Sequence, residues 1–71
     1  MLSTILNASN EELVKLFLDG KISFTDIVKI LKKITKLRDF KHFSKKRPKT
    51  INDIMYIDQW ARLKTQSLSV E

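Results

Sequence analysis

The chain has 71 residues and a formal net charge of +6, from 14 basic and 8 acidic side chains. It contains no cysteine and one histidine, His42, which excludes disulfides, thiolate metal sites and a histidine-rich metal cage. This length suits one small domain, and no segment approaches the roughly 18 apolar residues of a membrane-spanning helix. The first residues lack the basic start and apolar run of a signal peptide, so we predict a cytoplasmic protein.

The N-terminal part of the chain is predicted as an apolar stub, residues 1–8, followed by a helix at residues 9–19. Ser9 has the character of an N-cap residue, and Glu12 stands three residues later, as in a capping box. Gly20 is the only glycine, and it follows the apolar run directly. Because glycine readily adopts the left-handed conformation that ends many helices, Gly20 predicts the end of this helix.

A second helix is predicted at residues 24–38. Ser23 and Asp26 repeat the cap spacing at its start. The apolar stripe follows helical spacing and consists of Ile27, Ile30, Leu31 and Ile34. A set of lysines lies on the opposite side of the same helix: Lys29, Lys32, Lys33 and Lys36. The pattern therefore predicts one buried face and one lysine-lined solvent face.

The next segment is a basic connection, residues 39–49, which is broken by Pro48. Phe40 and Phe43 lie three residues apart within it. This spacing indicates either an extra helical turn or a loop held against the core.

A third helix is predicted at residues 51–64. Thr50 and Asp53 again have the spacing of a cap and its third residue. The apolar stripe of this helix consists of Ile51, Ile54, Ile57 and Ala61. Asp58 and Arg62 are four residues apart, so they can form an ion pair across one helical turn.

No alternating run of strand-forming residues competes with these helices. We therefore predict an all-α fold: a small three-helix bundle without a sheet, similar to an incomplete four-helix bundle. Residues 9–64 are predicted to form its single helical domain. The tail, residues 65–71, has no periodicity and is predicted to fray.

The charge is unevenly distributed along the chain. Between Ile27 and Asn52 there are ten basic residues and one acid, against four basic residues and seven acids elsewhere. A candidate interaction surface is therefore basic and contains Lys29, Lys32, Lys33, Lys36, Lys45, Lys46, Arg47 and Lys49. Such a surface could hold a nucleic-acid backbone, yet the sequence lacks a helix-turn-helix corner and interleaved exposed aromatics. A solvated face that maintains solubility is the favoured interpretation.

Independent catalysis is not predicted. The acid pairs Glu11 with Glu12 and Asp53 with Asp58 are explained by helix starts or by pairing across a turn. His42 lies in the basic connection without a neighbouring carboxylate to orient it. We accordingly assign no catalytic, cofactor-binding or metal-binding residue.

Two motifs occur in order along the chain. The first runs from Asn7-Ala8-Ser9-Asn10-Glu11 through Phe17-Leu18 and Gly20-Lys21-Ile22 to Phe24-Thr25-Asp26-Ile27. The second has the form Asp-Ile-x-x-x-Asp-x-Trp-Ala-Arg and spans residues 53–62. Together, over residues 7–64, they resemble the C-terminal helical domain of 1-deoxy-D-xylulose 5-phosphate reductoisomerase.

This resemblance implies a role in non-mevalonate isoprenoid synthesis, where full-length members carry out NADPH-dependent isomerisation and reduction with a divalent metal. The family's cofactor, metal and phosphate sites precede the helical domain, and a dinucleotide loop needs several glycines where this sequence has one. The prediction is a stand-alone, non-catalytic helical domain, an accessory brace or remnant, without a cofactor of its own. Its implied partners are a separate reductoisomerase catalytic chain or a second copy of itself. The alternative is a small basic module that binds nucleic acid or an acidic protein.

Overall fold

The first helix, α1, spans Leu2–Leu18 in the computed structural model, which describes residues 1–70. The prediction of an apolar stub before a helix start at Ser9 is therefore wrong. Five residues form the buried face of α1, namely Ile5, Ala8, Ser9, Glu12 and Leu13. They follow one continuous helical spacing, so Ser9 lies in the middle of the packed face and not at a cap. The capping signature here was a coincidence of residue types.

The end of α1 confirms the predicted stop. Gly20 has a φ of +74°, the left-handed conformation in which glycine carries no steric penalty. Its N–H donates to the carbonyl of Phe17 at 3.0 Å, and the N–H of Lys21 donates to the carbonyl of Leu16 at 2.9 Å. These two bonds form a Schellman motif, which satisfies carbonyls that the helix end would leave free.

The second helix, α2, spans Phe24–Thr35 and begins with the predicted capping box. The Asp26 N–H donates to the Ser23 hydroxyl at 3.3 Å, and the Ser23 N–H donates to the Asp26 carboxylate at 2.9 Å. Ile30 and Ile34 are its buried residues. The helix stops before residue 38, where the prediction had placed its end.

A short helix, α3 (Arg38–Ser44), follows α2 after a break at Leu37, whose backbone is extended. The break has a physical reason in the helical spacing. Phe40 is four residues after Lys36, so a straight continuation of α2 would place Phe40 on the lysine-lined solvent face. With the chain redirected at Leu37, Phe40 is buried at 8% exposure. Of the two structures left open for this segment, the extra helical turn is the one observed.

The last helix, α4, spans Ile51–Ser69 and begins with the second predicted capping box, between Thr50 and Asp53. It continues beyond the predicted end, and residues 65–69, predicted as a frayed tail, are helical. Thr65 explains the extension, because its side chain is completely buried. Glu71, the last residue of the predicted tail, lies outside the described residues.

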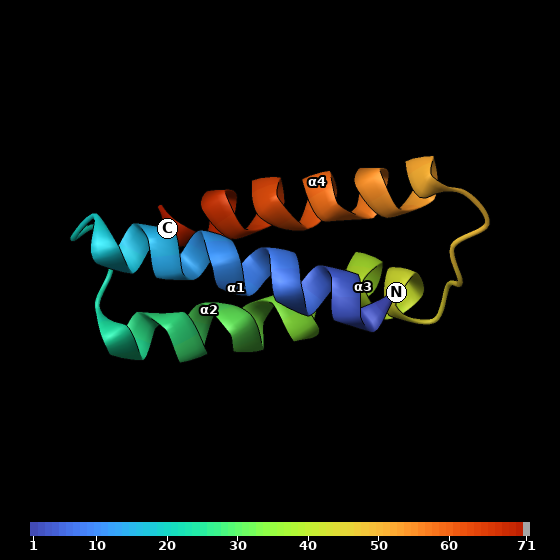
Figure 1. The fold of residues 1–71 in the computed structure, drawn as a ribbon. Coiled ribbons are helices and arrows are strands. Elements are labelled where there is room, and N and C mark those ends of the chain that lie inside the picture. The colour runs from blue at the N-terminus through green and yellow to red at the C-terminus, as the bar shows by residue number, and fades with distance from the viewer. Residues whose placement is uncertain (71) are drawn as a thin grey trace.

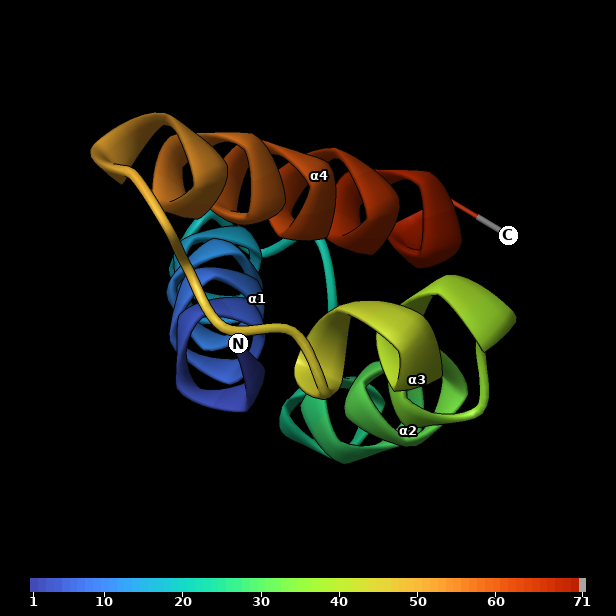
Figure 2. The same cartoon turned by 90° about the vertical axis from the view of Figure 1, so that its right-hand side faces the viewer.

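The helix α1 packs against both α4 and α2, and α2 also contacts α4, so that α4 crosses over the other two helices (Figure 1 and Figure 2). Seen along the bundle, α3 closes the end at which α1 begins (Figure 2). The core draws on all four helices and contains Ile5, Ala8, Leu13, Ile30, Ile34, Phe40, Ile57 and Ala61. The Met1 amino group donates to the carbonyls of Phe43 and Ser44, which ties the start of α1 to the end of α3.

The all-α prediction is confirmed, since residues 1–70 form helices and connections without any strand. The bundle has four helices in this part of the chain instead of three, because of α3. None of the helices in residues 1–70 is both long and apolar enough to cross a membrane.

Candidate functional site

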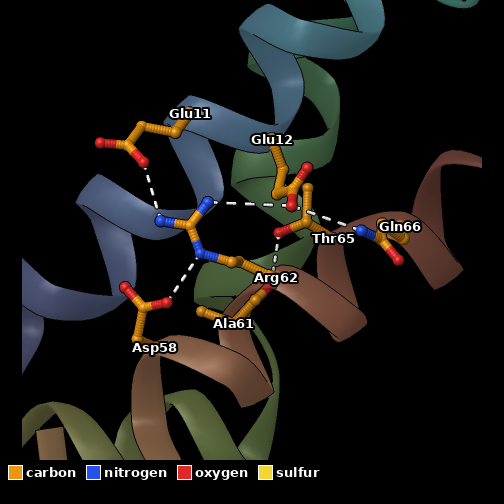
Figure 3. A network of polar contacts seen from close by, with 7 residues as sticks. All are labelled: Glu11, Glu12, Asp58, Ala61, Arg62, Thr65 and Gln66. Carbon is orange, nitrogen blue, oxygen red and sulfur yellow. Dashed lines mark hydrogen bonds and ion pairs between the residues drawn. The ribbon is translucent and has the colours of Figure 1, made fainter. Parts of the chain in front are cut away.

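Arg62 lies at the centre of the main polar network, where α1 and α4 face each other (Figure 3). Its Nε donates to the Asp58 carboxylate at 2.7 Å, one turn earlier on α4. Its terminal nitrogens approach two carboxylates of α1, Glu11 at 2.7 Å and Glu12 at 3.8 Å. One guanidinium group therefore links the two longest helices through three acids.

The network continues from Glu12 to a second side chain of α4. Glu12 is 8% exposed, and its carboxylate accepts a hydrogen bond from the Gln66 amide at 3.3 Å. Next to it, the buried Thr65 hydroxyl donates to the Ala61 carbonyl at 2.7 Å (Figure 3). Both polar groups are thus satisfied, as burial requires.

The electrostatics of the network favour the charged state of Arg62. Hydrogen bonds to Asp58 and then to Glu11 raise the pKa of Arg62 above its already high ordinary value. The guanidinium therefore stays protonated under all ordinary conditions. It acts as a fixed positive charge and has no use as a proton donor or acceptor in catalysis.

The sequence predicted one part of this network. The ion pair of Asp58 and Arg62 is confirmed, because side chains four residues apart on a helix lie next to each other. The contacts of Arg62 with Glu11 and Glu12 were missed, since Glu12 had been interpreted as part of a cap. The available signal was the spacing of Glu12 with Ile5, which places a carboxylate on a buried face that demands a partner.

The acids that cap α2 and α4, Asp26 and Asp53, have lowered pKa values. Hydrogen bonds from Ser23 lower the pKa of Asp26, and those from Lys49 and Thr50 lower the pKa of Asp53. Each carboxylate accepts backbone N–H groups at a helix start, so its ionised form is favoured.

We predict that stability falls as the pH drops below the ordinary aspartate pKa of 3.8. Because the folded-state pKa values of Asp26 and Asp53 lie below the unfolded values, the stabilisation is complete above 3.8 and is lost as the pH falls through the folded values. Melting temperatures from neutral pH down to about pH 2 measure this effect. The Asp26→Asn, Asp53→Asn double variant should melt lower at neutral pH and show a flatter acid limb. Parallel curves for both proteins would contradict this origin of the pH dependence.

The residues of the predicted basic surface are all exposed, but they fall into two groups. The first lies on the outer side of α2 and contains Lys29, Lys32, Lys33 and Lys36. The second follows α3 and contains Lys45, Lys46, Arg47 and Lys49. Three members of the second group, Lys46, Arg47 and Lys49, border a groove at the end of the bundle. The surface as a whole stays a prediction.

The side chains considered for catalysis have structural partners. Asp53 caps α4, and Glu11 and Asp58 both bind Arg62. His42 lies within α3 and not in a loop, with its ring 5.6 Å from that of Phe43. Within residues 1–70, no three His, Asp or Glu side chains gather as a metal site would require.

The fold and this network define a class of protein: a small all-α domain in which the main polar network links helices to one another. The particular family follows from comparison with known proteins. The chain matches the model of the DXP reductoisomerase C-terminal domain over residues 1–64 and belongs to that family. The resemblance suggested by the two sequence motifs is thereby confirmed.

Individual relatives agree with this assignment. The chain is 44% identical over 66 residues to 1-deoxy-D-xylulose 5-phosphate reductoisomerase of Proteus mirabilis, covering 93% of this chain and 15% of the relative. It is 39% identical over 70 residues to the enzyme of that name in Pelagibacter ubique, covering 99% of the chain and 18% of the relative. It is 45% identical over 60 residues to the Shewanella piezotolerans enzyme of that name, covering 84% of this chain and 14% of the relative.

The chain thus spans less than one fifth of the length of these relatives. Its 71 residues correspond to the C-terminal helical domain of the reductoisomerase family. The comparisons lend no support to a basic module for nucleic acid or an acidic protein. No solved structure matches the chain significantly.

Proposed function

We propose that this chain is the helical brace of a 1-deoxy-D-xylulose 5-phosphate reductoisomerase, that it packs on the enzyme's catalytic part and that it contributes no catalytic residue itself. The match to the C-terminal domain over residues 1–64 carries this proposal. The geometry supports it, because Arg62 and its three carboxylates form a network that joins α1 to α4. NADPH and a divalent metal are then bound by the catalytic part, as the resemblance implies.

The surface proposed for this contact lies along α1 and α2. Phe17 at the end of α1 and Phe24 at the start of α2 have ring centroids 6.0 Å apart, in an edge-to-face arrangement. They are 39% and 69% exposed. Leu6 and Val28 extend this patch, since they are spaced on the same sides of α1 and α2 as the two rings, and they are 37% and 49% exposed.

The proposed occupant of this patch is the catalytic part of the enzyme. More than four fifths of each relative lies outside the segment that this chain matches, which leaves a large partner to cover exposed apolar side chains. A second copy of this chain is the competing occupant, and it is distinguished by sedimentation at high concentration. A dimer that is broken by Phe24→Ser would show that the patch joins two copies.

The test is a chimera of the Proteus mirabilis enzyme in which its matched 66 residues are replaced by this chain. We expect NADPH-dependent turnover within about tenfold of the parent enzyme, a loss of no more than about 1.4 kcal/mol in transition-state stabilisation. The same enzyme with the segment deleted is the control and should lose activity. The isolated chain should neither bind NADPH nor turn over substrate. A folded but inactive chimera, or turnover by the chain alone, would contradict the proposal.

Matched variants of the chimera test the contact surface. Phe17→Ser with Phe24→Ser should reduce activity or assembly, because both side chains belong to the proposed contact. Ile51→Ser with Met55→Ser is the control, since these α4 side chains are also exposed, at 69% and 62%, but lie outside the patch. Equal effects of the two pairs would rule out the patch as the docking surface.

A further inference from the structure

A groove of about 510 Å³ opens at the end of the bundle where α1 begins, α3 ends and α4 begins. This is the end that faces the viewer in Figure 2. Small-molecule sites in proteins enclose about 300–1,000 Å³, so the groove is large enough for a ligand of that class. It plays no part in the proposed packing surface on α1 and α2.

The groove has apolar and aromatic walls, formed by Met1, Phe43, Tyr56 and Ile57. The ring of Phe43 is held edge-to-face by two others, with centroids 6.2 Å from Tyr56 and 5.0 Å from Trp60. Such contacts stabilise the position of the ring, so this wall of the groove is built by the packing of α3 against α4. A preformed apolar wall favours a ligand with an apolar body.

The rim of the groove is cationic. Lys46, Arg47 and Lys49 border it, and all three are exposed. The Lys46 ammonium lies over the Phe43 ring, 5.9 Å from its centroid, so a cation of the rim adjoins the aromatic wall. Within residues 1–70 none of these three cations forms an ion pair, because each observed ion pair involves Arg62.

One acid, Asp53, also borders the groove, but its carboxylate is already engaged. It accepts the N–H groups of Lys49 at 2.9 Å and Thr50 at 3.2 Å, as the cap of α4 requires. The carboxylate stays ionised there, and the rim keeps a surplus of positive charge because three cations face this one acid.

We propose that this groove binds a small amphiphilic anion, an alkyl or aryl phosphate or carboxylate, with its apolar body against Phe43 and Tyr56. The charged head then lies among Lys46, Arg47 and Lys49, three cations that form no ion pair within residues 1–70. This site is independent of the brace function, because no residue of the α1 and α2 patch borders it.

Hexyl phosphate is the probe that tests this site. Trp60, the only tryptophan, contacts Phe43 and reports binding by fluorescence, and amide shifts in NMR spectra locate it. We expect hexyl phosphate to bind at least tenfold more tightly than inorganic phosphate or hexanol, which supply only the head or only the body. Each methylene from butyl to hexyl phosphate should improve affinity about twofold to fourfold, as burial of apolar surface predicts. Equal affinities for hexyl and inorganic phosphate would overturn the proposal.

Two matched pairs of variants locate the ligand. The triple variant Lys46→Gln, Arg47→Gln, Lys49→Gln should weaken hexyl phosphate binding about tenfold. The triple variant Lys29→Gln, Lys32→Gln, Lys36→Gln removes the same charge from α2 and should change affinity less than twofold. For the apolar wall, Tyr56→Ala should weaken binding about fivefold and Met55→Ala should not.

Melting curves establish that these variants are folded, which is expected because every replaced side chain is exposed. Equal weakening by both triple variants would show non-specific attraction to a basic protein and would overturn the assigned site. Amide shifts confined to α2 would do the same.

Discussion

Replacing Ile5 with alanine is expected to destabilise the domain by about 2–5 kcal/mol, the cost of a buried large-to-small substitution. Ile5 is completely buried in the core that joins the helices. A domain of this size has a net stability of roughly 3–5 kcal/mol, so the variant should be largely unfolded at or slightly above room temperature. Urea unfolding followed by far-ultraviolet circular dichroism measures the loss.

Two neighbouring apolar residues provide the control for Ile5. Leu2 and Leu6 lie close to Ile5 at the start of α1, but their side chains are 47% and 37% exposed. Alanine at either position should cost less than about 1 kcal/mol, because little buried surface is lost. Should all three variants behave alike, the first eight residues would be the loose stub that the sequence had indicated, and α1 would not begin at Leu2.

The parts of the fold that could be predicted from the sequence are those that short separations determine. The caps at Ser23 and Thr50 each need a partner only three residues away, and Gly20 ends α1 through its own backbone freedom. The ion pair of Asp58 and Arg62 is equally local, because its two residues are four positions apart on α4. Such features are decided by residue type and spacing before any tertiary contact forms.

The errors arose where tertiary packing decides. Ser9 with Glu12 has the spacing of a cap, and only the helix register that begins at Leu2 shows that both lie on a packed face. The tail gave no periodic signal, but Thr65 is buried because α4 continues alongside α1. Local propensity is weak evidence against such packing, which stabilises most helices in proteins.

The groove at the end of the bundle was predicted least well, because the residues that line it come from distant segments of the chain. The basic residues were found by counting charges, but nothing in the count distinguishes Lys46 at the groove from Lys32 on the outer side of α2. The aromatic wall combines Phe43 of α3 with Tyr56 of α4, and only the packed bundle brings these rings together. Charge is visible in a sequence, whereas a concave surface is a property of the fold.

The Arg62→Met variant is expected to lose about 2–3 kcal/mol of stability, or on the order of 10 °C in melting temperature. Methionine keeps much of the apolar stem, so the loss reports the charge and its hydrogen bonds. The reason is Glu12, whose side chain is only 11% exposed and would be left without a cation. The effect stays below that of a fully buried pair, because the Arg62 side chain is 29% exposed. Lys64→Met, on the same helix, is the control and should cost less than about 1 kcal/mol.

A double-mutant cycle separates this explanation from a simple loss of packing. Glu12→Gln removes the buried charge and keeps an oxygen that can accept the hydrogen bond of Gln66. If the cost of Arg62→Met comes from an unpaired carboxylate, the same change in the Glu12→Gln background should cost about 1 kcal/mol less. Additive effects would instead assign the loss to Asp58, Glu11 and the arginine stem. Because Arg62 lies on α4 and Glu12 on α1, the coupling energy measures how strongly this one pair holds α1 against α4, which is part of the rigidity that a brace requires.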